Sequence, residues 1–114
     1  MTERFGPLAR IHHRPEFLAV ERGGRRVSGR YVTLVGKPND GATDRLGIVA
    51  SRRVGDAVDR NRAKRRLREV FRRRAQQGRS LDVVAIARTD LIRAPFTVVQ
   101  SDFLAALMKL RGAR

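Results

Sequence analysis

The 114-residue chain has no cysteine, no tryptophan and only two histidines. Without cysteine it can form neither a disulfide nor a thiolate zinc site. The two histidines, His12 and His13, are adjacent, and adjacent side chains rarely converge on one metal ion. No acidic pattern accompanies them, so we expect no metal bound by the protein alone and interpret both histidines as surface residues.

Long apolar runs are also missing. No run approaches the roughly 20 residues that a membrane-spanning helix needs. The first 17 residues, MTERFGPLARIHHRPEF, lack the apolar centre of a secretion signal. We therefore expect a cytoplasmic protein with no membrane partner. The length and a hydrophobic content of 41% predict one domain, residues 1–114, with its own core. Within it, residues 1–13 are expected to form an irregular basic arm.

Acidic residues are scarce. The chain has 26 Lys and Arg but only 11 Asp and Glu, which gives a net charge of +15 and a pI near 11.9. Charge of one sign at this density predicts a polyanionic partner, most commonly a nucleic acid. An anionic membrane surface fits less well, because the most basic segment has only Phe71 as an aromatic anchor.

That most basic segment is Asp59–Arg74. From Arg60 onward it has nine Lys or Arg residues and one acid, Glu69, and so holds +8 of the net +15. It has no glycine or proline and consists mainly of strong helix formers. Its apolar residues recur at the spacing of one helix face, which predicts an amphipathic helix docked on the core. These residues are Ala63, Leu67, Val70 and Phe71.

The opposite face of this helix would present guanidinium groups. An arginine fork matches phosphate oxygens bidentately, in a way that lysine does not. Like charges three and four residues apart repel each other, and Glu69 relieves only part of that repulsion. The single sign and the arginine bias favour a polyanion-binding surface over an ordinary solvated charged face.

The whole chain reads as an α+β fold in the order α-β-β-β-α-β-α. We expect residues 30–35 and 45–51 to form an antiparallel hairpin across a polar turn at 36–44. The nearly continuous apolar run at 81–87 predicts a strand at the sheet centre. The other expected elements are a helix from Pro15 to Arg22, a short edge strand at 25–27 and a final helix after Thr97.

The segment GIVASRRVGDAVDRNRAKRRLREVF, residues 47–71, resembles the protein subunit of bacterial ribonuclease P. The RNR motif of that family falls on Arg60, Asn61 and Arg62, and its signature of a strand followed by a basic pair falls on Leu46–Arg53. The likeness extends from about Leu8 to Arg111. It implies an α/β sandwich with a left-handed βαβ crossover, an exception to the usual handedness.

The resemblance also implies a function. The chain would be an accessory subunit of an endoribonuclease in which an RNA subunit, with its bound Mg²⁺, carries out catalysis. The protein would bind that RNA and the 5′ leader of precursor tRNA, with no cofactor of its own, no catalytic residue and no DNA partner. The residues that the resemblance assigns to RNA binding are Arg52, Arg53, Arg60, Asn61, Arg62, Lys64, Arg65 and Arg68.

The resemblance further implies a leader-binding cleft between the basic helix, the first helix and one sheet face. It assigns Phe17, Val32, Leu34 and Val49 to this cleft. Two positions depart from the family, because Glu21 and Leu34 stand where an aromatic residue is common. Stacking of bases on aromatic rings is a main source of single-strand binding, so we expect a weaker stacking contribution here.

Three alternatives remain open from the sequence. A ribosomal or other structural RNA-binding protein would suit the size and charge equally. A DNA-binding helix is less suitable, because the arginines cover too wide an arc and no heptad zipper follows. A protein-only nuclease would need clustered acids, which the sequence spacing of the aspartates does not provide. We interpret Asp56 and Asp59 instead as partners of the positive start of the basic helix.

Overall fold

The computed structural model describes residues 14–39, 41–74 and 80–112, with side chains described from residue 19 onward. The predicted basic arm, residues 1–13, lies outside the described residues. The element order confirms the predicted α-β-β-β-α-β-α arrangement, with one additional 3₁₀ turn, η2. The elements are α1 (Arg14–Gly23), β1 (Arg25–Ser28), β2 (Val32–Pro38), β3 (Arg45–Val49), α2 (Ala57–Arg73), β4 (Leu81–Ala87), η2 (Leu91–Arg93) and α3 (Phe96–Gly112).

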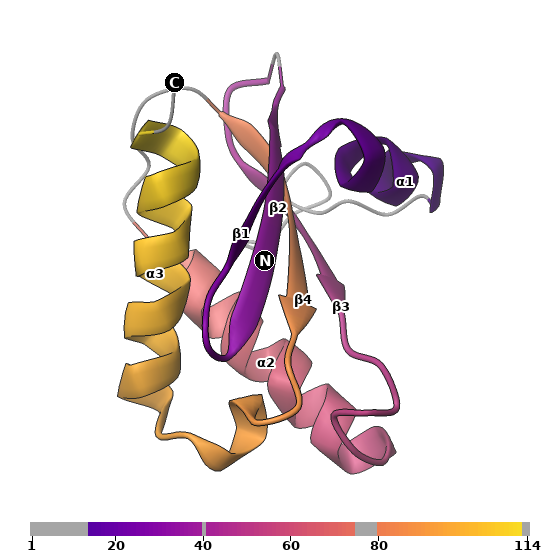
Figure 1. Ribbon diagram of the computed structural model, residues 1–114, viewed down its shortest axis with the longest axis vertical. Helices are drawn as coiled ribbons and strands as arrows, with labels where there is room; N and C mark the ends of the chain where they lie inside the picture. The colour runs from indigo at the N-terminus through magenta and orange to yellow at the C-terminus, as the bar shows by residue number, and fades with distance from the viewer. Residues whose placement is uncertain (1–13, 40, 75–79, 113–114) are drawn as a thin grey trace.

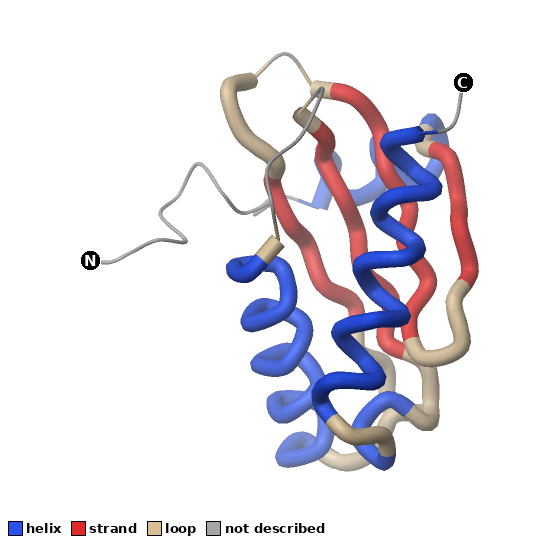
Figure 2. The backbone as a smooth tube through the Cα atoms, turned by 90° about the vertical axis from the view of Figure 1, so that its left-hand side faces the viewer, coloured by secondary structure: helices blue, strands red, loops and turns tan. Residues whose placement is uncertain are grey.

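The four strands form one mixed sheet in the order β1-β2-β4-β3. β1 and β4 both pair antiparallel with β2, whereas β3 pairs parallel with β4. Helices α2 and α3 cover one face and α1 covers the other (Figures 1 and 2). The connection from β3 through α2 to β4 is left-handed, as the resemblance implied.

The predicted hairpin between residues 30–35 and 45–51 is wrong, because β4 lies between β2 and β3. β4 is apolar on both faces, so a central position buries both of them, as we predicted for this strand. β2 also continues through Gly36 to Pro38, where it pairs with the start of β4. Arg45 and Asp82 fix the parallel register with a two-pronged ion pair, Nε–Oδ1 at 2.8 Å and Nη2–Oδ2 at 2.7 Å.

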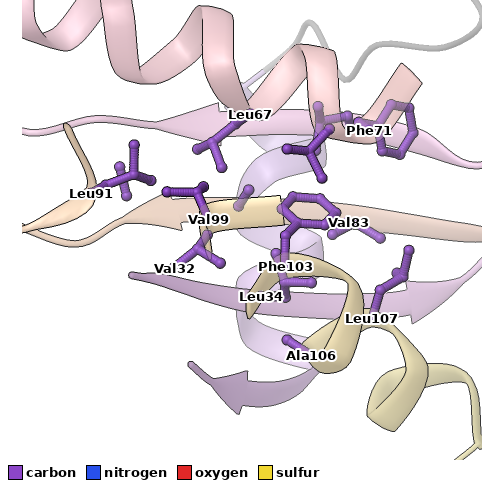
Figure 3. Packing of buried hydrophobic residues seen from close by; sticks show 14 of the residues in the cluster. Val32, Leu34, Leu67, Phe71, Val83, Leu91, Val99, Phe103, Ala106 and Leu107 are labelled. Carbon is purple, nitrogen blue, oxygen red and sulfur yellow. The ribbon is translucent and has the colours of Figure 1, made fainter. Parts of the chain in front are cut away.

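The main core lies between the sheet and the pair α2 and α3 (Figure 3). The predicted apolar stripe of α2 is confirmed, since its four side chains are at most 1% exposed. Leu67 and Phe71 of this stripe share the core with Phe103 of α3 and Val83 of β4. A smaller cluster on the opposite face joins α1 to the sheet and consists of Val20, Val35 and Val84.

The turn before α2 explains where the basic helix begins. Asp56 is the N-cap, and its Oδ1 accepts a hydrogen bond from the backbone N–H of Asp59 at 3.0 Å. Gly55 has a φ of +148°, and a Cβ there would lie 2.2 Å from Asp59 Oδ2. The turn therefore requires glycine, and the predicted position of Asp56 and Asp59 at the helix start is confirmed.

Asp102 of α3 fastens the β1–β2 turn to the helix layer. Its carboxylate accepts hydrogen bonds from the backbone N–H groups of Arg30 and Tyr31, both at 2.9 Å, and of Val32 at 3.2 Å. Three donors on one carboxylate form a charge-assisted cluster, which is stronger than neutral hydrogen bonds. The clamp holds the exposed edge of the sheet against α3.

Replacing Asp102 with alanine is expected to lower the free energy of unfolding by about 2 kcal/mol, because three N–H groups lose a charged acceptor. Urea denaturation measures this change. The matched control is S101A, the neighbouring exposed residue on the same helix. Equal urea midpoints for the two variants would contradict the assigned clamp.

Candidate nucleic-acid interface

The arginines of α2 divide into two groups by their partners. The side chains of the first group bond to other residues of the protein. Arg66 donates to the carbonyl oxygen of Ala94 at 2.8 Å, and so ties α2 to the end of η2. Arg72 and Arg73 both contact the carboxylate of Glu69, at 2.5 and 2.7 Å. Hydrogen bonds from these two arginines hold the pKa of Glu69 below its ordinary value.

The second group of α2 side chains is the one assigned to RNA. Asn61, Arg62 and Arg65 are exposed, whereas Arg60, Lys64 and Arg68 are half-buried. Within the described part of the chain, the side chains of Arg60, Arg62, Lys64 and Arg65 make no hydrogen bond or ion pair. Their charges are therefore not neutralised by the fold and remain available to phosphate oxygens.

Helix geometry places these cations on a particular side of α2. Arg66 and Arg73 define the flank that faces η2 and α3, since Arg73 Cζ lies 5.2 Å from the ring centre of Phe96. Arg60, Lys64 and Arg68 recur every four residues along the opposite flank. This row of cations runs beside the β3 edge of the sheet, away from α3.

Arg52 and Arg53 extend the same surface. Both are exposed in the turn that joins β3 to α2, and the buried side chain of Val54 anchors that turn. Backbone hydrogen bonds from Val54 to Ser51 and from Gly55 to Arg52 hold its shape, at 3.0 and 3.1 Å. The basic pair lies at the N-terminal end of α2, where the helix dipole is also positive.

The structure corrects the predicted leader cleft. Val32 and Leu34 are 0% exposed and belong to the main core that faces α2 and α3 (Figure 3). Val49, by contrast, packs against the cluster on the α1 face. Side chains alternate along a strand, so Val32 and Leu34 cannot share a face with Thr33 and the α1 side of the sheet. The prediction that Val32 and Leu34 line a cleft beside α1 is therefore wrong.

The strand register identifies the residues that occupy that face instead. Thr33 lies opposite Ile86, and Ile86 lies opposite Val49, so the three form one row across the sheet. Ile86 and Val49 are half-buried beside the cluster that α1 covers. Ile86 was missed from the sequence, because the nearly continuous apolar pattern of β4 does not show which face each side chain takes. Thr33 was missed because Val32 and Leu34 were assigned to the face that it occupies.

The remaining residue assigned to the cleft, Phe17, belongs to α1, and its side chain is outside the described residues. Glu21 is exposed on α1.

Leu34 faces the main core, so the inference that it replaces a cleft aromatic does not hold. Tyr31 is held elsewhere, since its hydroxyl accepts from Arg30 Nε at 3.0 Å and its backbone N–H binds Asp102.

Several acidic residues stabilise the fold. Among the described residues there is no group of three or more His, Asp or Glu side chains that could hold a metal ion. Asp44 and Asp82 are both paired with arginines, and Asp56 caps α2. The helices in the same part of the chain include none that is long and apolar enough to cross a membrane.

A mixed sheet that buries one side of an arginine-rich helix and leaves the other side cationic defines a small basic protein of the α+β class, suited to bind a polyanion. A family model described as Ribonuclease P matches residues 5–111. The chain therefore belongs to the ribonuclease P protein family, which confirms the resemblance and takes precedence over the ribosomal and DNA-binding alternatives.

Individual relatives agree with this assignment. The chain is 34% identical to the ribonuclease P protein component of Citrifermentans bemidjiense over 110 residues, which covers 96% of this chain and 95% of that one. It is 33% identical to the corresponding protein of Thermotoga maritima, over 98% and 100% of the two chains. Among solved structures, the Staphylococcus aureus RNase P protein matches with a TM-score of 0.80 at 27% identity, covering 90% of this chain and 97% of that chain.

Proposed function

We propose that this chain, as the protein component of ribonuclease P, binds the catalytic RNA and the 5′ leader of precursor tRNA and so promotes removal of the leader. The observation that carries the proposal is the set of four α2 cations, Arg60, Arg62, Lys64 and Arg65, whose side chains make no hydrogen bond or ion pair with other described residues. Catalysis is assigned to the RNA subunit and the Mg²⁺ that it holds. The protein contributes charge and position.

The physical reason is electrostatic. The catalytic RNA and the precursor tRNA are both polyanions and repel each other. A protein with a net charge of +15 placed between them lowers that repulsion and reduces the concentration of Mg²⁺ needed for cleavage. Binding through lysine and arginine also releases condensed counterions, so the affinity should fall steeply as salt rises.

The face of the sheet beside α1 is the proposed site of the leader. Ile86 and Val49 offer apolar side chains to a single-stranded segment, in the same row as the buried side chain of Thr33. None of the three is aromatic, so contact with the bases would rest on shape more than on stacking. Mature tRNA lacks the leader, and this face would therefore distinguish substrate from product.

The test of this function is cleavage of precursor tRNA by the cognate RNA subunit at low Mg²⁺, with and without the protein. We expect the protein to raise the rate at least about tenfold at low Mg²⁺ and to have a much smaller effect at high Mg²⁺, where the metal already screens the phosphates. We expect no cleavage by the protein alone. No effect at any Mg²⁺ concentration would refute the proposal and direct the search to ribosomal RNA.

A second arm of the same experiment tests the leader site. V49A should weaken binding of precursor tRNA to the holoenzyme while leaving binding of mature tRNA unchanged. The matched control is V98A, which shortens a 41% exposed valine on α3. Equal losses for precursor and mature tRNA would mean that Val49 acts only through packing of the fold.

A further inference from the structure

A second group of exposed cations lies at the opposite edge of the sheet from α2. We call it the β1-edge surface. It combines the two arginines of the edge strand, one from the last turn of α1 and one from the β1–β2 turn, and all four are exposed. These residues are Arg22, Arg25, Arg26 and Arg30. β1 is the outer strand on its side, whereas α2 packs under the other edge strand, β3.

The strand geometry arranges these side chains around the edge. Arg25 lies opposite Gly36 and Arg26 opposite Val35. Neighbouring side chains of a strand point to opposite faces, so the two guanidinium groups straddle the edge. Lys37 adds a further positive charge, since its Nζ lies 3.7 Å from the position that a Cβ on Gly23 would take. The edge therefore presents cations on both of its sides.

These charges are not neutralised within the described chain. The side chains of Arg22, Arg25 and Arg26 make no hydrogen bond or ion pair with other described residues. Arg30 donates to the hydroxyl of Tyr31, which is uncharged, and its guanidinium lies 5.4 Å from that ring centre. The nearby carboxylate of Asp102 is occupied by three backbone N–H groups. A positive field therefore remains at this edge.

The two basic surfaces are separated by a neutral face. α3 contacts both β1 and α2 and lies between them (Figure 2). Its exposed side chains up to Met108 are uncharged and form the neutral face, whereas Lys109, the next residue, is an exposed cation. The neutral face consists of Thr97, Val98, Ser101, Ala105 and Met108. Charged residues on an edge strand commonly prevent edge-to-edge aggregation. That role would explain β1, but not the arginines placed on either side of it.

We propose that the β1-edge surface binds the backbone phosphates of an RNA segment other than the one bound by α2, so that the protein bridges two RNA segments. This inference rests on the proposed function and specifies how the protein acts between two polyanions. The outer edges of β1 and β3 face away from each other across three strand spacings, about 14 Å. A phosphate backbone that follows one edge therefore reaches the other only by turning across the sheet or the neutral face of α3.

The first test compares two double variants that both lower the net charge of +15 by two units. R25Q/R26Q removes charge from the β1 edge, and S101E/A105E adds acid to the neutral face of α3. For R25Q/R26Q we expect binding of precursor tRNA and RNA subunit to weaken at least about tenfold and the slope of log K against log salt to become shallower by about 1.4 to 1.8. The control should stay close to wild type. Identical behaviour of the two pairs would overturn the proposal.

The second test attaches a cleavage probe to a single introduced cysteine. Because the chain has no cysteine of its own, each variant carries one probe per molecule. A tethered iron–EDTA group is placed at S28C on β1, at V58C at the start of α2, or at S101C on α3, in the full-length protein assembled with RNA. We expect the probes on β1 and α2 to cut different nucleotides and the α3 probe to cut little. A β1 probe that cuts no more than the α3 probe, or that cuts the same nucleotides as the α2 probe, would refute the bridge.

The two tests also separate this inference from the function on which it rests. If R62Q/R65Q on α2 weakens RNA binding and R25Q/R26Q does not, the proposed function stands and the second surface is refuted. If neither pair weakens binding more than S101E/A105E does, the proposed function itself fails. Thermal unfolding of each variant shows whether a loss of binding reflects a loss of fold.

Discussion

Replacing Arg62 and Arg65 with glutamate is expected to weaken binding of ribonuclease P RNA at least about 100-fold near 0.1 M salt, because each reversal removes a proposed phosphate contact and adds repulsion. Both side chains are exposed and have no partner among the described residues, so the fold should remain intact. Filter binding over a range of salt concentrations measures the affinity, and circular dichroism measures the fold.

Two further variants set the scale for this prediction. R62Q/R65Q should give an intermediate loss, because it removes the contacts without adding repulsion. S101E/A105E lowers the net charge by the same two units as R62Q/R65Q but acts on the neutral face of α3. If the glutamate pair bound RNA as well as S101E/A105E, or if it were unfolded, the assignment of this face of α2 to RNA would be wrong.

The second large effect concerns Asp44, which is 0% exposed and joins four elements. One carboxylate oxygen accepts from the backbone N–H of Leu81 at 2.8 Å. The other accepts from Arg74 Nε at 3.0 Å and from Arg111 Nη2 at 2.5 Å. The start of β4 and the C-terminal ends of α2 and α3 therefore meet at one buried charge, next to the first residue of β3.

Replacing Asp44 with asparagine is expected to lower the free energy of unfolding by about 3 to 5 kcal/mol, because it leaves two largely buried guanidinium groups without their counter-charge. Urea denaturation at neutral pH measures the change. D90N is the control, since Asp90 is exposed and its side chain makes no capping hydrogen bond. A urea midpoint for D44N equal to that of D90N would contradict the assigned role.

The same site predicts a pH dependence. Burial alone raises the pKa of Asp44, but hydrogen bonds from Arg111, the Leu81 N–H and Arg74 outweigh it and hold the pKa below its ordinary value. A lowered pKa in the folded state means that this stabilisation is present above the ordinary pKa of about 4 and is lost as pH falls through the lowered value. Urea midpoints measured down to about pH 2 should therefore fall less steeply for D44N than for the wild type.

Local features of the fold were predictable from the sequence because their signals are local. The spacing of Ala63, Leu67, Val70 and Phe71 predicted which side of α2 is buried, and all four are in the core. The apolar run Leu81–Ala87 predicted a central strand, and β4 is central. The basic row on α2 was likewise visible, since helical periodicity follows from the backbone alone.

Pairings between distant segments were not predictable in the same way. The sequence does not state that β4 separates β2 from β3, because neighbouring strands in a chain pair often but not always. The assignment of Val32 and Leu34 to the wrong face shows a second limit. A change of one residue in alternation moves every side chain of a strand to the other face, and only the partner strands fix that choice.

The sequence by itself therefore determined the composition of this protein's main surface: a helix with an apolar side that must be buried and a cationic side that must find a polyanion. The tertiary structure alone decided that Arg66 and Arg74 are not available, because folding brings Ala94 and Asp44 to them from distant segments. The pairing of Arg72 and Arg73 with Glu69, by contrast, is local to the helix. The tertiary structure also decided that the charges of β1 and α2 lie at opposite edges of one sheet. The physical reason is that helix periodicity depends on residues a few positions apart, whereas ion pairs and sheet edges depend on contacts between segments far apart in the chain.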